Sequence, residues 1–578
     1  MARAIALFSP GGFSLRLFLG WLLAIVVLLA LPLSSRHLLA AGSGAGSATA
    51  IPGTHSVTPG ITPVAEHFPP RHNVVMIVID AGRPSYFSLA KLPHLQALMR
   101  QGIVYNQAWT GEMQSTTPNV HVTLGTGTLP RENGFLGFGW AAPQTRDPVD
   151  FRTLLADGQI DPVLRSLPVA SIASLLHTTY PGSVSIAASG HKNYAVVGLG
   201  GGAANYELYG KFLNNHFVPT FLHGPPPLSR KQLQGLTVKS PLPIGAEDSW
   251  AVRYSLDVIR RTKPQLFMIN LPEVDTWGHW YGPDDHAVFR RLMLNFDRLL
   301  GQIEATYRSL GMLKNTDFII TADHAMVESR AAHDWHLIYT AAHRAGTGIA
   351  RADGGAGSIW LKDPNQAKAV AQNLVALKPA HVQAVFYRSS TNTDFDYVQA
   401  SPSSWEIGPN DEAALKFLVD TTDGRTGPDV WMIYREAYTA APRNVAGKWK
   451  GTHGGATWQV QHIPLIISGP GVKAGVRSSY PAQSVDMAAT TEYLLGLHAD
   501  SPTGVVLADA LRHPPLRWVQ EQRKLAPALS RYVSGLEFES RRDNTRAVPP
   551  PGFFPLRCTT SPHPVLRPPC KSPKPTNQ

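Results

Sequence analysis

Four short apolar segments constrain the fold of this chain more than any other feature of its sequence. They are Val74–Ile79, Leu266–Leu271, Phe318–Thr321 and Ile463–Ile467. Each is rich in β-branched or aromatic residues, which is typical of strands buried on both faces. Helical patterns lie between them, at Leu92–Met99, Ala287–Tyr307 and Ala367–Leu377. This alternation predicts an α/β fold, with a mostly parallel central sheet and helices on both faces.

Acidic and imidazole side chains stand next to these segments. Asp80 follows the first; Asp275 and His279 follow the second; Asp323 and His324 follow the third; and His453 precedes the fourth, in a glycine-rich loop. Functional residues of an open parallel sheet gather beyond the carboxyl ends of its strands, so we expect these six side chains to meet. Carboxylates and imidazoles without thiolates suit zinc or manganese. Three aspartates and three histidines divide into two sites, one with Asp80, Asp323 and His324, the other with Asp275, His279 and His453.

A second motif is Ser115-Thr-Thr-Pro-Asn119, which precedes an apolar helical stretch. Proline favours the first turn of a helix, and the free N–H groups at that end favour an anion. A threonine hydroxyl beside a divalent cation loses its proton more easily and becomes a nucleophile. Thr116 and Thr117 are both candidates for that role, and Thr116 is also a candidate metal ligand.

The rest of the chain predicts an exported protein with insertions in its catalytic domain. Residues 1–41 form a signal peptide or a membrane anchor, because arginines precede the apolar run 17–33 and small residues follow it. Residues 42–71 form a linker, 72–515 the catalytic domain, 516–544 a helical extension and 545–578 a Pro-rich disordered tail. Residues 141–180 and 203–247 look like loop insertions, and 325–450 contain a cap. We expect a periplasmic or secreted protein, which residues 17–33 would tether to the membrane if they are retained as an anchor.

The distribution of charge argues against nucleic-acid binding, and the positions of the cysteines give no indication of catalysis. The formal net charge is +11, but +3 belongs to residues 1–72 and +5 to residues 545–578, which leaves +3 for the body. We therefore expect no specific nucleic-acid binding. Cys558 and Cys570 are the two cysteines of the sequence, and both lie in the tail. A disulfide there would say nothing about catalysis.

Together these segments resemble the alkaline phosphatase superfamily, specifically its nucleotide pyrophosphatase/phosphodiesterase branch, over residues 72–515. The matching motifs are the strand ending in Asp80, Thr116-Thr-Pro-Asn119, Asp275-Thr-Trp-Gly-His279, Asp323-His324-Ala325 and His453, in the same order as in that branch. The resemblance implies a covalent phosphothreonine and two divalent metals, most simply zinc with manganese as the alternative.

Three departures from the family pattern concern the phosphate side of the site. The Thr-x-Pro rule selects Thr116 as nucleophile, whereas counting back from Thr126-Gly127 selects Thr117; we favour Thr116. Phe138 falls where the family carries a phosphate-contacting asparagine. Lys192-Asn-Tyr194 resembles the Lys-x-Arg pair of some phosphomonoesterases, with tyrosine in place of arginine. Lys192 is therefore a third candidate catalytic residue.

The function that fits these motifs is hydrolysis of a small-molecule or lipid-head-group phosphoester outside the cytoplasm. A membrane-tethered phosphotransferase is one alternative, although the sequence has a single apolar N-terminal segment. A metal-bound binding protein without turnover is another, because Phe138 replaces the usual asparagine. A sulfatase is disfavoured, since Thr116 and Val120 occupy the positions where sulfatases need Cys or Ser and Arg.

Overall fold

The structure is a computed structural model. It describes residues 71–142, 144–156, 163–164, 167, 169–223, 226–332, 336–344, 348–390, 395–402, 405, 409–422, 426–439, 448–498, 501 and 503–546. The predicted signal or anchor, both cysteines and all but the inner ends of the linker and the tail lie outside this range. Among the described residues, no helix combines the length and apolar character that a membrane crossing requires.

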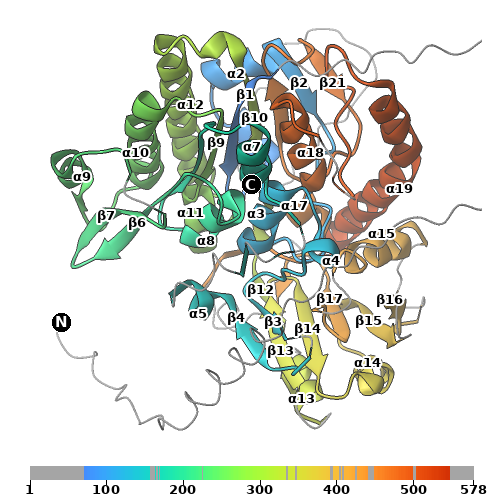
Figure 1. The fold of residues 1–578 in the computed structure, drawn as a ribbon. Helices are drawn as coiled ribbons and strands as arrows, with labels where there is room; N and C mark the ends of the chain where they lie inside the picture. Colours follow the sequence, from blue (N-terminus) through green and yellow to red (C-terminus); the bar gives the residue numbers. More distant parts are fainter. Residues whose placement is uncertain are drawn as a thin grey trace, which may run out of the picture. The chain divides into compact units, whose positions relative to one another are not determined.

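A ten-stranded sheet forms the centre of the fold (Figure 1). Its strands, in spatial order, are β21 (Val476–Ser478), β2 (Gly102–Tyr105), β20 (Leu465–Ser468), β10 (Thr316–Thr321), β1 (Asn73–Ile79), β9 (Leu266–Leu271), β5 (Ser185–Ser189), β6 (Tyr206–Leu213), β7 (His216–Phe221) and β8 (Val238–Lys239). The neighbours β10, β1, β9, β5 and β6 are parallel. The predicted α/β fold with a mostly parallel sheet is therefore confirmed.

Strand β20, formed by most of the fourth apolar segment, runs against its neighbours. It pairs antiparallel with both β10 and β2. Its amino end therefore lies at the sheet edge where β1, β9 and β10 have their carboxyl ends. For this reason His453, which precedes its strand, reaches the same edge as the acids that follow theirs.

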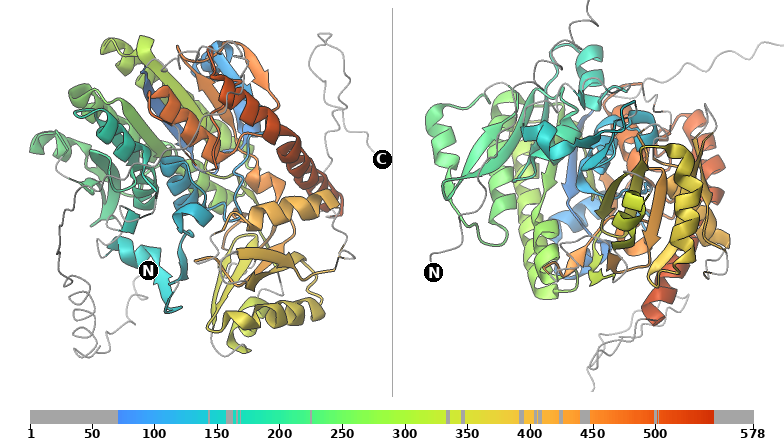
Figure 2. Two further views of the ribbon diagram at one scale, coloured as in Figure 1. Left: turned by 45° about the vertical axis from the view of Figure 1, so that its right-hand side comes forward. Right: turned by 90° about the horizontal axis from the view of Figure 1, so that it is seen from below.

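The sheet is covered on both faces, as alternating side chains of β1 show. Val74, Met76 and Val78 belong to one hydrophobic cluster, which includes residues of α3 (Thr117–Thr126), α8 (Asn193–Gly200) and α18 (Ser484–Leu494). Val75 and Ile77 belong to the opposite cluster, with α10 (Ala246–Thr262) and α12 (His286–Ser309). All of these β1 side chains are almost fully buried. Burying each of them contributes roughly 1.5–3 kcal/mol to the stability of the fold. Figure 2 shows helices along both faces from two further directions.

The prediction of loops over residues 203–247 is wrong. Strands β6, β7 and β8 extend one end of the main sheet there, and α9 (Arg230–Leu236) lies between the last two. The β6–β7 ribbon leaves Phe212 and Leu213 exposed. Its many turn residues and its lack of a continuous apolar run concealed it in the sequence. The prediction of loops is also wrong for part of residues 141–180. They include β4 (Pro148–Asp150), which pairs with β3 (Gly139–Ala141), and the helices α5 (Phe151–Ala156) and α7 (Ile172–Thr179).

A second sheet of five strands lies within the long interval between His324 and His453. Its order is β13 (Gly348–Asp353), β14 (Ala356–Leu361), β17 (Val430–Tyr434), β15 (Val382–Ser390) and β16 (Phe395–Gln399). Helices α13 (His336–Arg344) and α14 (Ala367–Ala376) pack on it. The interval begins and ends in a two-stranded pair, β11 (Val327–Glu328) with β19 (Gly451–Thr452). The long helix α19 (Leu516–Arg546) packs against α15 (Pro409–Val419) of the same interval.

Candidate active site

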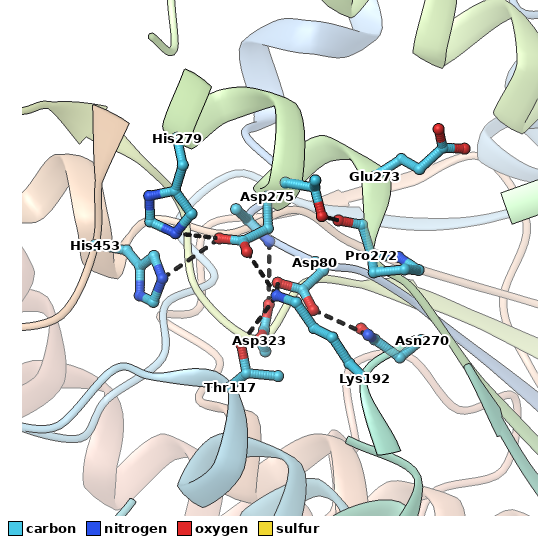
Figure 3. Close-up of polar contacts among 12 residues, drawn as sticks. Asp80, Thr117, Lys192, Asn270, Pro272, Glu273, Asp275, His279, Asp323 and His453 are labelled. Carbon is cyan, nitrogen blue, oxygen red and sulfur yellow. Dashed lines mark hydrogen bonds and ion pairs between the residues drawn. The ribbon is translucent and has the colours of Figure 1, made fainter. Parts of the chain in front are cut away.

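Six of the candidate residues meet at the edge of the main sheet described above. Asp80 follows β1, and Asp323 and His324 follow β10. Helix α11 (Glu273–Tyr281) begins two residues after β9 and places Asp275 and His279 one turn apart on the same side. His453 follows β19. Figure 3 shows that Asp80, Asp275, Asp323, His279 and His453 point toward one another.

Asp275 lies between two of the histidines. Its Oδ1 is 3.3 Å from Nε2 of His279 and 3.3 Å from Nε2 of His453. On the other side of the cluster, His324 Nε2 is 3.2 Å from Asp323 Oδ2 and 3.9 Å from Asp80 Oδ1. Two groups of candidate ligand atoms result, one from Asp275, His324 and His453, the other from Asp80, Asp323 and His324. His324 thus belongs to both, whereas the sequence division assigned it to one and gave His279 to the other.

The three histidines present the same nitrogen to the cluster. The Nδ1 atoms of His279, His324 and His453 contact the backbone oxygens of Gly451, Ala325 and Ser115, at 2.8, 3.2 and 3.4 Å respectively. A carbonyl oxygen only accepts, so Nδ1 carries the proton and Nε2 keeps a lone pair toward the carboxylates. This is how histidine ligands of metals are oriented in proteins.

The carboxylates also fit metal ions. Asp275 Oδ1 and Asp323 Oδ2 are buried and accept no hydrogen bond from the described residues. Buried carboxylate oxygens without donors are costly unless a cation binds them. Facing lone pairs on oxygen and nitrogen are the donor set that zinc and related divalent ions select. The residues present therefore fit a divalent metal centre.

Lys192 brings an ammonium group into the same cluster. It is the N-cap residue of α8, which follows β5, and its side chain is buried. Its Nζ donates to Asp80 Oδ1 at 2.8 Å and to Asp275 Oδ2 at 2.6 Å (Figure 3). Lys192 therefore bridges one carboxylate from each of the two candidate ligand groups.

The local charges shift the pKa values of these groups. Burial and the negative charge of Asp323 raise the pKa of Asp80 well above its usual range, although Lys192 opposes them. Burial also pushes the pKa of Asp275 upward, but the ammonium group of Lys192 outweighs it, and the net pKa is well below the ordinary value. Burial lowers the pKa of His324 to about 3, so this imidazole is neutral at pH 7. Neutral imidazoles are what metal binding needs.

The two candidate nucleophiles have different surroundings. Thr117 is the first residue of α3, and its Oγ1 lies 3.3 Å from His324 Nε2 and 3.4 Å from Lys192 Nζ. Thr116 is the N-cap, and its hydroxyl instead donates to Asn119 Oδ1 at 2.6 Å. Asn119 donates in turn to Glu112. The Thr-x-Pro rule favours Thr116, whereas the hydroxyl that contacts the cluster is that of Thr117, the residue that counting back from Thr126-Gly127 selects.

Three further residues support the cluster and were missed in the sequence. Asn270, inside β9, donates to Asp80 Oδ2 at 2.9 Å. His121, one turn beyond Thr117, contacts the Thr117 carbonyl oxygen at 2.8 Å and has its Nδ1 3.6 Å from Asp323 Oδ2. Trp449 stacks on His279 with ring centroids 3.9 Å apart. A polar residue inside an otherwise apolar strand or helix was the available signal for the first two; Trp449 had none.

A cavity of about 630 Å³ opens over this cluster. Thr116, Thr117, Lys192, Asp275, His279 and His453 line it. Phe138 and Tyr194, the two departures from the family pattern, also line it and pack edge to face at 5.4 Å between ring centroids. Neither an asparagine nor an arginine stands at these two positions, so other groups must contact the oxygens of a bound phosphoryl group.

Sequence comparisons with known proteins find similarity to a family of phosphoester-cleaving enzymes. Residues 74–456 match the family described as type I phosphodiesterase / nucleotide pyrophosphatase. Over 56 residues, 10% of this chain, the sequence is 38% identical to bis(5'-adenosyl)-triphosphatase ENPP4 of Homo sapiens; the match spans 12% of that protein's length.

Solved structures with the same fold were also found. The crystal structure of the alkaline phosphatase PafA superposes with a TM-score of 0.59 at 16% identity, covering 76% of this chain and 99% of that one. An inactive variant of murine ectonucleotide pyrophosphatase / phosphodiesterase 5 in complex with AMP gives a TM-score of 0.51 at 16% identity, covering 78% and 100%.

Proposed function

The chain belongs to the type I phosphodiesterase / nucleotide pyrophosphatase family and is a phosphoester hydrolase, and from this premise we propose that it cleaves phosphodiester or phosphoanhydride bonds through a covalent intermediate on Thr117. The observation that carries the proposal is the position of the Thr117 hydroxyl, which contacts both His324 and Lys192 within the carboxylate–imidazole cluster.

We further propose two divalent ions, zinc by preference. The residues that would hold them are Asp80, Asp323 and His324 for one, and Asp275, His279 and His453 for the other. When bound, such ions lower the pKa of a neighbouring hydroxyl and neutralise charge on phosphoryl oxygens. The neutral Nε2 atoms and the carboxylate oxygens without hydrogen bonds support this assignment.

The chain's own groups account for the remaining steps. Thr117 Oγ1 attacks phosphorus and gives up its proton, a new O–P bond forms, and the bond to the leaving-group oxygen breaks. That oxygen departs with the electron pair and takes up the proton that the hydroxyl released. Water then attacks the phosphothreonine, releases the phosphate monoester and restores the hydroxyl. The amino end of α3 favours the negative charge of the phosphoryl group throughout. Lys192 holds an ammonium group within 3.4 Å of the attacking oxygen.

Diesters are favoured over monoesters as substrates. A cavity of about 630 Å³ has room for a second ester arm beside the phosphoryl group. The arginine of the Lys-x-Arg pair, which would bind an extra phosphoryl oxygen, is replaced by Tyr194. AMP bound to the structurally similar murine protein, and the bis(5'-adenosyl) substrate in the name of the human relative, make nucleotide diesters the first class to test.

The test is turnover of an aryl phosphodiester and an aryl phosphomonoester by zinc-loaded full-length protein. Thr117→Ala is expected to abolish diester turnover without changing bound metal, and Thr116→Ala to retain most of it. Mass spectrometry of acid-quenched enzyme should locate the phosphoryl group on Thr117. Phosphorylated Thr116, or activity in Thr117→Ala, would contradict the assignment. Transfer of the phosphoryl group to an added alcohol in preference to water would identify a phosphotransferase instead.

We also propose export of the protein from the cytoplasm. The proposal rests on the N-terminal sequence pattern alone. Fractionation of cells, with N-terminal sequencing of the recovered protein, tests it and distinguishes a cleaved signal from a retained anchor. Recovery of the intact chain in the cytosolic fraction would contradict it.

A further inference from the structure

Two arginines line the cavity above the cluster of candidate metal ligands and lie outside the motifs quoted from the sequence. Arg152 lies on α5 and Arg351 on β13, a strand of the second sheet. Both line the same cavity as Thr117 and Lys192. Segments about 200 residues apart thus bring two guanidinium groups to one wall of the site.

Arg152 is held by an aromatic ring instead of by an acid. Its guanidinium carbon lies 4.5 Å from the centroid of the Phe138 ring, a distance typical of a cation–π contact. Among the described residues, no carboxylate lies within ion-pair distance of Arg152. Its N–H groups are therefore available to an anion in the cavity.

Arg351 is held against the β3–β4 ribbon. Its Nη1 lies 3.6 Å from Asp150 Oδ2, and both side chains are partly exposed. Gly139 pairs with Asp150 across the ribbon, and a side chain at Gly139 would collide with the guanidinium group. The absence of a side chain at Gly139 thus leaves room for the Arg351 guanidinium group, and Asp150 contacts one side of that group.

Burial separates these arginines from the reacting atoms. Thr117, Lys192 and Asp275 are almost fully buried. Arg152 is exposed, and the Arg351 side chain is 27% exposed. The arginines therefore stand at the rim of the cavity, while the nucleophile stands at its floor. A group bound at the rim belongs to an ester arm of the substrate and not to the phosphoryl group under attack.

We propose that Arg152 and Arg351 form an anion-binding subsite for a second negatively charged group on the substrate. This inference rests on the proposed phosphodiesterase function and specifies its substrate class. The substrates are diesters or anhydrides of phosphate in which one arm carries a further phosphate or carboxylate. Planar guanidinium groups bind both anions through paired hydrogen bonds, which supply selectivity as well as affinity.

The experiment compares two matched substrates of the zinc-loaded full-length protein. One is p-nitrophenyl ethyl phosphate, with a neutral arm; the other is p-nitrophenyl 2-phosphoethyl phosphate, in which the same arm ends in a phosphate. The quantity measured is the ratio of kcat/KM for the second substrate to that for the first. Arg152→Gln and Arg351→Gln should each lower this ratio about tenfold. Asp150→Asn should raise it, because it removes the carboxylate that competes for Arg351.

Arg308→Gln serves as the matched control, since Arg308 is exposed near the carboxyl end of α12, at the far edge of the sheet from the site. Equal losses on both substrates would overturn the proposal, because the arginines would then act on the transferred phosphoryl group. An unchanged ratio would also overturn it.

Calorimetric binding of both esters to Thr117→Ala protein separates the subsite from catalysis. Tighter binding of the phosphate-bearing ester, weakened by Arg152→Gln, supports the subsite even if the wild-type protein hydrolyses neither ester. In that case the proposed function alone would fail.

Discussion

Replacing Lys192 by methionine tests whether its ammonium group substitutes for metal charge in the metal-free protein. Its Nζ lies within 2.8 Å of Asp80 and Asp275, and the side chain is buried. Removal leaves the carboxylates of the cluster without a permanent positive charge. Breaking a buried ion pair by removing one partner costs about 3–5 kcal/mol.

This cost converts into a measurable melting shift. The unit that contains the site spans residues 66–578, so its unfolding entropy is roughly 1 kcal/mol/K at about 2.1 cal/mol/K per residue. The metal-free Lys192→Met protein should therefore melt about 3–5 °C below the wild type. Saturating zinc should remove most of this difference, because the ions then neutralise the same carboxylates. By the same thermodynamic cycle, zinc should bind the variant more tightly by most of this roughly 3–5 kcal/mol, about a hundredfold or more, since no ammonium competes with it.

Differential scanning calorimetry with and without chelator measures the first effect, and competition with a zinc indicator measures the second. Lys314→Met is the control, because Lys314 is exposed near the opposite end of β10. If the metal-free variant melts with the wild type, or if zinc raises both melting temperatures equally, Lys192 does not compensate the carboxylates as argued.

Three further changes test other parts of the site. Asp323→Asn should lower bound zinc and activity together, measured by atomic emission and aryl-ester turnover; full metal content would contradict its role as a ligand. Burial raises the pKa of Glu112 to about 8, so the folded protein holds this proton more tightly than the unfolded chain. The associated stability, up to about 5 kcal/mol, is complete below about pH 4.5 and is lost as the pH rises through 8. Glu112→Gln should therefore flatten the fall in melting temperature between pH 5 and 9, and an unchanged profile would refute this. Gly451→Ala places a Cβ against the Gly278 carbonyl oxygen and the Met326 sulfur; it should displace the His453 loop and reduce bound zinc, whereas Gly235→Ala, in open space, should leave zinc content as it is.

The central sheet was predictable because buried parallel strands leave a strong local signal. Val74–Ile79 is a continuous apolar run, Leu266–Leu271 is apolar except for Asn270, and an acid of the cluster follows each of them. The direction of β20 was not predictable, since a short apolar run reads the same in a parallel and an antiparallel strand. Strands β6 and β7, near one end of the sheet, have no continuous apolar run, so their pairing depends on tertiary contacts.

The candidate metal ligands and nucleophiles of the site could be predicted from the sequence, but the contacts among them could not. Six strand-end residues could be collected from the sequence because the sheet brings them to one edge. The choice between Thr116 and Thr117 depends on one residue of helix register, which a motif does not determine. Arg351 reaches the cavity from β13, a strand of the second sheet. It lies about 200 residues from Phe138 and Asp150 in the sequence, and no local sequence pattern connects it to them.

The β11–β19 pair has a consequence for how such a protein can diversify. Val327 pairs with Thr452 and Glu328 with Gly451, so the chain departs and returns at one point between His324 and His453. Lengthening the excursion adds little closure entropy, and it does not shift either histidine. Substrate specificity can therefore evolve independently of metal binding. Related proteins can differ in the segment that carries Arg351, and thus in the preferred ester arm, while they keep the same residues at the base of the cavity.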